Sequence, residues 1–186
     1  MQLGDELIKE QIFFRKELRE RVPWFIRLRW TAAAALFAGT WLAYLQWRVI
    51  PVLALNLLVL FVVLCNIGFY FSWRRLEVDR LQQVKPFIVL AHTQIISDFC
   101  ALYLLIYFTG GIHSPLLIFV IFHVILAGIL LSPLSCFLYG LSVPVVLGGM
   151  IFLQASKFLR SYPAVFQRPG SFHPLEFPQI LPPLTI

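Results

Sequence analysis

Charged side chains are scarce in this sequence of 186 residues, in which 60% are hydrophobic. Asp, Glu, Lys and Arg together make up 13%, against about 25% in soluble domains. A water-soluble domain of this length could not bury so much apolar surface, so the composition excludes that class and predicts an integral membrane protein. The net charge of +6 does not indicate nucleic-acid binding, because the basic residues are grouped beside apolar runs.

Cysteine is also scarce, and recognisable catalytic motifs are absent from the sequence. Cys65, Cys100 and Cys136 lie inside apolar runs and form no C-x-x-C, so they predict neither a disulfide framework nor a zinc site. The chain has no phosphate-binding loop, nucleophile elbow or H-E-x-x-H motif. We therefore expect no enzymatic activity and no metal site in this chain.

The sequence is rich, by contrast, in long apolar runs. Each is long enough for a helix that crosses a bilayer, which takes roughly 17–25 residues. Backbone groups in hydrocarbon have no water partner, so these runs should be helices. We predict an all-α integral membrane domain over residues 24–156, a bundle of five transmembrane helices. The runs cover about 30–47, 50–72, 87–108, 116–133 and 134–156.

Two different segments flank this domain. Residues 1–23 mix apolar and charged positions, a pattern typical of an amphipathic helix on an anionic leaflet or of a solvated leader helix. Pro23 would then begin the first spanning helix, where its missing N–H leaves nothing unpaired. The tail 157–186 holds six prolines and predicts no further helix.

The basic residues predict the orientation. Seven precede the first apolar run and four lie in the linker 73–86. Because cytoplasmic loops carry the excess of Lys and Arg, we expect a multi-pass membrane protein with its N-terminus in the cytoplasm.

The third apolar run is interrupted by polar side chains. Gln94 and Asp98 share a helix face at a spacing of four residues, and an unpartnered charge in hydrocarbon costs several kcal/mol. Counted from Phe108, Asp98 lies about 15 Å deep, and His123 lies roughly 10 Å deep in the fourth run. Asp98 and His123 could therefore meet, either as a proton-responsive or head-group site or as a hydrogen bond that fixes packing. A haem between His92 and His123 is disfavoured, since their depths differ by roughly 14 Å.

The connection after the third run is a second candidate site. Two glycines allow positive φ and a tight reversal, and a proline suits the start of the next helix. A simple hairpin explains these residues, whereas Thr109, His113 and Ser114 at the water boundary leave ligand contact as the alternative. The candidate binding residues are Gln94, Asp98, Thr109, Gly110, Gly111, His113, Ser114, Pro115 and His123.

The stretch 98–115, D-F-C-A-L-Y-L-L-I-Y-F-T-G-G-I-H-S-P, resembles the third helix and following loop of bacterial sensor histidine kinases with a multi-span membrane input domain, of which the RegB/PrrB redox-sensing group is the best-known branch. The resemblance extends over about 24–156 and implies sensing of a membrane-soluble or envelope signal, with quinone at this loop in the redox branch. In that branch an Asn and a Phe occupy the positions of Ser114 and Leu116.

The resemblance also implies a homodimer and a cytoplasmic kinase output domain or response regulator reached through the full-length protein. No H-E-x-x-x-P motif or ATP-binding domain is present in this sequence. We therefore expect an input half, either a truncated chain whose tail precedes a missing sixth helix or an orphan domain. The alternatives are a small transporter or membrane-complex subunit with an Asp98/His123 polar relay, and a plain membrane anchor.

Overall fold

The computed structural model describes residues 2–47, 50–78 and 85–162. Over this part of the chain the fold is all-α, as the apolar runs predicted, and it contains no strand. Two short 3-10 turns, η1 and η2, stand between the third and fourth helices. The elements are α1 (Gln2–Trp47), α2 (Val52–Val78), α3 (Lys85–Phe108), η1 (Gly111–His113), η2 (Pro115–Leu117), α4 (Ile118–Leu130) and α5 (Pro133–Ala155).

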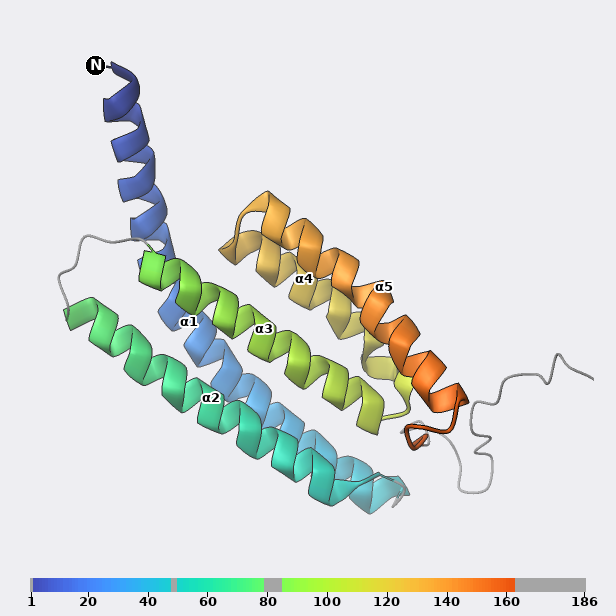
Figure 1. Cartoon of the computed structure of the whole chain (residues 1–186). Coiled ribbons are helices and arrows are strands. Elements are labelled where there is room, and N and C mark those ends of the chain that lie inside the picture. The colour runs from blue at the N-terminus through green and yellow to red at the C-terminus, as the bar shows by residue number, and fades with distance from the viewer. Residues whose placement is uncertain (1, 48–49, 79–84, 163–186) are drawn as a thin grey trace, which may run out of the picture.

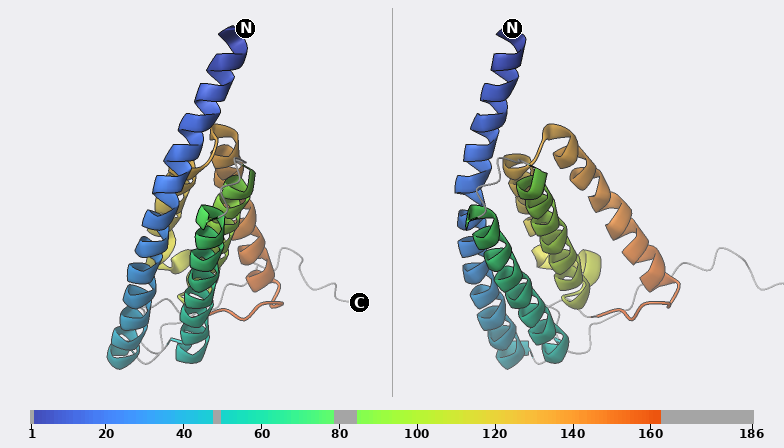
Figure 2. Two further views of the ribbon diagram at one scale, coloured as in Figure 1. Left: turned by 90° about the vertical axis from the view of Figure 1, so that its left-hand side faces the viewer. Right: turned by 60° about the vertical axis from the view of Figure 1, so that its left-hand side comes forward.

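Helix α3 occupies the centre of the bundle. Successive helices run in opposite directions, and α3 packs against α1 and α2 on one side and against α4 and α5 on the other (Figures 1 and 2). The first part of α1 extends beyond the bundle as a projecting helix (Figure 1). A side chain on α3 can therefore touch either half of the molecule, depending on the face it occupies.

The number of helices suited to crossing a membrane differs from the prediction. Within the described residues three helices are long and apolar enough, over Val52–Leu76, Lys85–Phe108 and Pro133–Ala155, so five was wrong on this criterion. The apolar helix Pro115–Leu130 is shorter, because it begins with a 3-10 turn and ends before Ser132. The run 30–47 is helical, but its Trp, Thr, Tyr and Gln residues lower its hydropathy.

The first helix also differs from the prediction, because α1 continues through Pro23 instead of beginning there. Proline removes one hydrogen bond inside a helix. Val22, Phe25 and Ile26 are nonetheless buried against α2 and α3, and this packing holds the helix together across the proline. The segment 1–23 is thus joined to the first apolar run as one helix.

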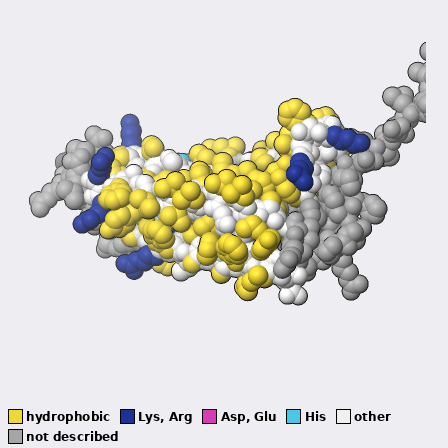
Figure 3. Space-filling view, turned by 90° about the horizontal axis from the view of Figure 1, so that it is seen from below, with side chains coloured by type: hydrophobic (Ala, Val, Ile, Leu, Met, Phe, Trp, Pro, Cys, Tyr) yellow, Lys and Arg dark blue, Asp and Glu magenta, His cyan; other side chains and the backbone are white. Residues whose placement is uncertain are grey.

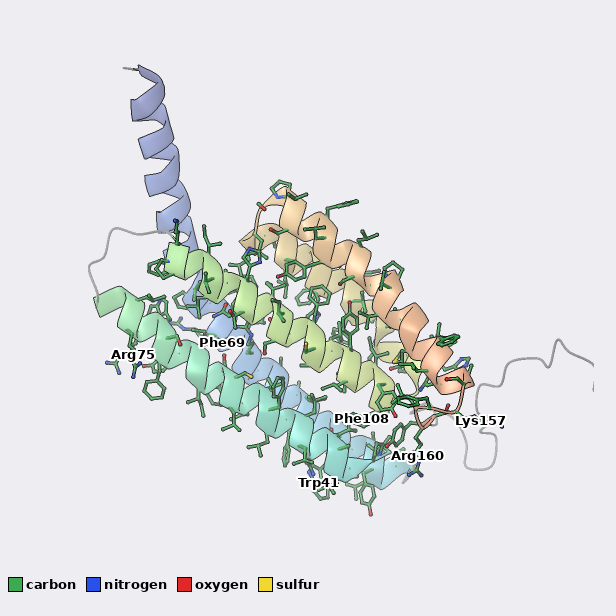
Figure 4. The ribbon with its side chains drawn as sticks, in the orientation of Figure 1. Trp41, Phe69, Arg75, Phe108, Lys157 and Arg160 are labelled. Carbon is green, nitrogen blue, oxygen red and sulfur yellow. The ribbon has the colours of Figure 1, made fainter. Side chains whose placement is uncertain are left out.

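The outer surface suits a lipid environment. Large apolar side chains on α2, α4 and α5 are exposed, among them Leu53, Ile118 and Val145. In the space-filling view, apolar side chains cover the middle of the molecule and Lys and Arg lie toward its ends (Figure 3). Arg75 lies at one end, and Lys157 and Arg160 lie at the other (Figure 4). The predicted tail beyond residue 162 and the linker 79–84 lie outside the described residues.

Candidate functional site

The centre of the candidate site is an ion pair between α1 and α3. Arg29 donates two hydrogen bonds to Asp98, from Nε to Oδ1 at 2.7 Å and from Nη2 to Oδ2 at 2.6 Å. This fork geometry is the strongest arrangement of arginine and carboxylate. The two side chains are only 8% and 17% exposed. Asp98 therefore has the partner that a charge inside an apolar bundle needs, and the partner is Arg29.

Sequence reasoning counted Arg29 among the seven basic residues before the first apolar run and gave it no partner. In the structure the Arg29 guanidinium lies over the ring of Phe69 at 5.1 Å, a cation–π contact with α2. Its third nitrogen, Nη1, is buried and has no hydrogen-bond partner among the described residues. Arg29 thus touches both neighbouring helices, and one of its nitrogens stays unpaired inside the protein.

His123 on α4 does not take the place predicted for it beside the carboxylate. Its Nδ1 bonds the backbone carbonyl oxygen of Phe119 at 2.8 Å, and its ring lies edge-on to Phe99 with centroids 5.9 Å apart. The Asp98 carboxylate bonds Arg29 instead. The structure therefore brings Asp98 and His123 to one cavity without pairing them.

That cavity is elongated and almost entirely apolar. It has a volume of about 710 Å³ and is lined by α1, the start of α2, α3, η2 and α4. Its volume lies within the range of about 300–1,000 Å³ that small-molecule sites occupy. The polar side chains that reach it are those of Arg29, Thr31, Thr40, Asp98, Thr109 and His123.

Gln94 lies one turn before Asp98 on α3, as predicted, but it does not line the cavity. It is fully buried, and neither atom of its side-chain amide has a hydrogen-bond partner among the described residues. Nearby on α2, Asn66 donates to the carbonyl oxygen of Ile26 at 3.0 Å. The side-chain amides of Gln94 and Asn66 therefore lie on the same side of α3 as the ion pair, toward α1 and α2.

The Thr109–Pro115 connection is a closely packed turn. The hydroxyl groups of Thr109 and Ser114 lie 2.6 Å apart, and both residues are buried. Gly110 and Gly111 have φ of 119° and 61°. This is the positive φ predicted for them.

The two sides of this turn differ. A Cβ at Gly111 would lie 2.9 Å from Oε1 of Gln154 on α5, so the turn rests directly on α5. His113 and Pro115 are exposed, and Pro115 reaches the cavity rim. The buried hydroxyls and the glycines thus have structural partners, and the exposed histidine faces outward.

On the opposite face of α3, the contacts are aromatic and neutral. His92 Nδ1 lies 3.0 Å from the Tyr139 hydroxyl. Phe99 stacks on Tyr139 with centroids 5.7 Å apart. The Tyr103 hydroxyl lies 3.3 Å from that of Ser142. His92 therefore ties α3 to α5, while His123 bonds within α4.

No protein-family model, curated protein or solved structure matches this chain. The features of the molecule that bear on its function are therefore the ion pair, the cavity and the turn.

Proposed function

We propose that this chain is the transmembrane signal-sensing domain of a two-component sensor histidine kinase, embedded in the bacterial inner membrane with its N-terminus in the cytoplasm. In this proposal the bundle, including the first apolar run and α4, lies in the bilayer. The full-length protein is a homodimer that carries the kinase core. The observation that carries the proposal is the Arg29–Asp98 pair in the wall of a ligand-sized cavity.

A sensor needs two states that a ligand distinguishes. The intact ion pair defines one of these states, because it holds α1 against α3 beside the cavity. A ligand that bonds the arginine changes the balance of contacts that holds this pair. Because α1 is one continuous helix from the cavity to its projecting end, a tilt of α1 at Arg29 moves that end on the cytoplasmic side.

Autophosphorylation of the full-length protein in proteoliposomes tests this proposal. Asp98→Asn should change the basal phosphorylation level several-fold and remove its response to membrane extracts. Cys100→Ser, at an exposed α3 position two residues away, is the control and should behave as wild type. Wild-type phosphorylation and response in Asp98→Asn would overturn the proposal.

The second candidate is a transporter, favoured by the fact that Asp98 and His123 line one cavity. Proton or ion flux through proteoliposomes holding this chain alone, abolished by Asp98→Asn, would favour it. A kinase input domain predicts no flux.

A further inference from the structure

The long axis of the cavity follows α1. Its lining residues on that helix extend from Phe25 to Ala43, about 27 Å at 1.5 Å per residue. Much of this wall is made of small side chains, namely Ala32, Ala33, Ala35, Gly39 and Ala43. Small residues on one wall leave room for a long, narrow molecule.

The cavity opens on the outer surface of the bundle. Several lining residues are also surface residues, among them Leu42, Phe119 and Phe122, which are 67%, 47% and 46% exposed. These three belong to α1 and α4, which face each other across α3. In a membrane this opening meets lipid chains, so a ligand reaches the cavity from the bilayer.

The ion pair decides the charge of the ligand. Arg29 and Asp98 neutralise each other, so a charged head group would add an uncompensated charge to an apolar site, which is costly. Arg29 is 7% exposed and its Nη1 is enclosed by protein, so the pair offers a ligand no free charge. The head group that fits beside it is neutral.

His123 restricts the head group further. The Phe119 carbonyl can only accept, so Nδ1 of His123 carries the proton in this bond. In the neutral ring Nε2 is then an acceptor. A hydroxyl group can donate to this nitrogen, whereas a ketone or quinone oxygen can only accept.

We propose that the cavity between α1, α3 and α4 binds a neutral single-chain lipid with a hydroxyl head, whose proton bonds His123 Nε2. This deepens the proposed sensing function and rests on it for its biological consequence. The binding itself can be tested without the kinase.

The test uses the chain in lipid nanodiscs and a photoreactive analogue of hexadecanol. The probe should label peptides of α1 and α4 that line the cavity, and unlabelled hexadecanol should compete. Gly39→Leu should reduce labelling about tenfold, because Gly39 lines the cavity and a Cβ there meets nothing within 4 Å. Gly68→Leu is the matched control, since Gly68 has equally open space but does not line the cavity.

Head-group recognition is tested by competition. His123→Phe should weaken competition by hexadecanol about fivefold, the loss expected for one hydrogen bond, and His123→Gln should retain most of it. Both variants must keep the helical content of the wild type. Palmitate or a short-chain quinone competing as well as hexadecanol would overturn the hydroxyl assignment. Equal labelling of wild type and Gly39→Leu would show annular lipid only and overturn the site.

The two proposals fail separately. If labelling of the cavity falls in Gly39→Leu and competition weakens in His123→Phe, while hexadecanol leaves phosphorylation unchanged, the lipid site stands and the sensing proposal fails. An Asp98-dependent phosphorylation response without cavity labelling would do the reverse.

Discussion

Helix α3 is held on its two sides by different chemistry. Toward α1 it presents a buried carboxylate to an arginine, and toward α5 it presents histidine and tyrosine to neutral hydroxyls. Removing one member of a buried ion pair leaves an uncompensated charge, which costs about 3–5 kcal/mol. Losing a neutral hydrogen bond costs only about 0.5–1.5 kcal/mol. The contact on the α1 side is thus the more costly one to disrupt, and the contacts on the α5 side are individually weak.

The largest expected effect is that of Asp98→Asn, about 3–5 kcal/mol of stability, because Arg29 stays charged and buried. Unfolding of the chain in mixed detergent micelles measures this loss. Replacing both partners by methionine, as Arg29→Met with Asp98→Met, should restore most of the stability, because no buried charge remains. A loss below 1 kcal/mol for Asp98→Asn would remove the contrast between the two sides of α3.

Gly111→Val should have the next largest effect. The residue has φ of 61°, and its Cβ would press on Gln154 Oε1. A β-branched residue in this conformation costs about 1–3 kcal/mol. The same micelle unfolding assay measures it, with Gly148→Val as control because a Cβ there meets nothing within 4 Å. Equal losses in the two variants would show that the turn does not depend on this glycine.

Tyr139→Phe removes one neutral bond, that to His92, and keeps the ring stacked on Phe99. The expected loss is about 1 kcal/mol, and thermal unfolding followed by circular dichroism detects it. A loss as large as that of Asp98→Asn would place a second charged or switching contact on the α5 side.

The smallest effect is expected for Tyr103→Phe. Its partner Ser142 also bonds the Tyr139 carbonyl oxygen at 2.6 Å, so Ser142 keeps a partner when the tyrosine hydroxyl is lost. We expect a change below about 0.5 kcal/mol, measured in the same thermal experiment. A larger change would indicate that the hydroxyls of α3 and α5 act as one network.

Part of the site was predictable from the chain alone. Asp98 and Gln94 stand out because polar residues interrupt an apolar run, and Gly110 and Gly111 stand out as a turn. Both predictions match the observed helix and turn. Arg29 was missed because it precedes the apolar run, where a basic residue is normally interpreted as a flanking charge that sets the orientation in the membrane. An arginine at the very edge of an apolar run, with a carboxylate elsewhere in the membrane domain, was the signal that could have found it.

Depth counting also shows why the partner of Asp98 was misjudged. Arg29 is eighteen residues before Trp47 and Asp98 is ten before Phe108, about 27 and 15 Å from their helix ends. The residues meet because α1 continues past the end of α3 (Figure 1). Counting from helix ends assumes that all helices end at one level, and these do not.

The sequence by itself determined that the chain is helical and suited to lipid, because composition and run length state how backbone and side chains must be solvated. It also determined the turn, because only glycine adopts positive φ without strain. The tertiary structure decided which helix supplies the partner of Asp98, how many helices are long and apolar enough to cross a membrane, and that α1 continues through Pro23. Those outcomes depend on how whole helices pack and on how far one is shifted along another, which a local sequence pattern does not contain.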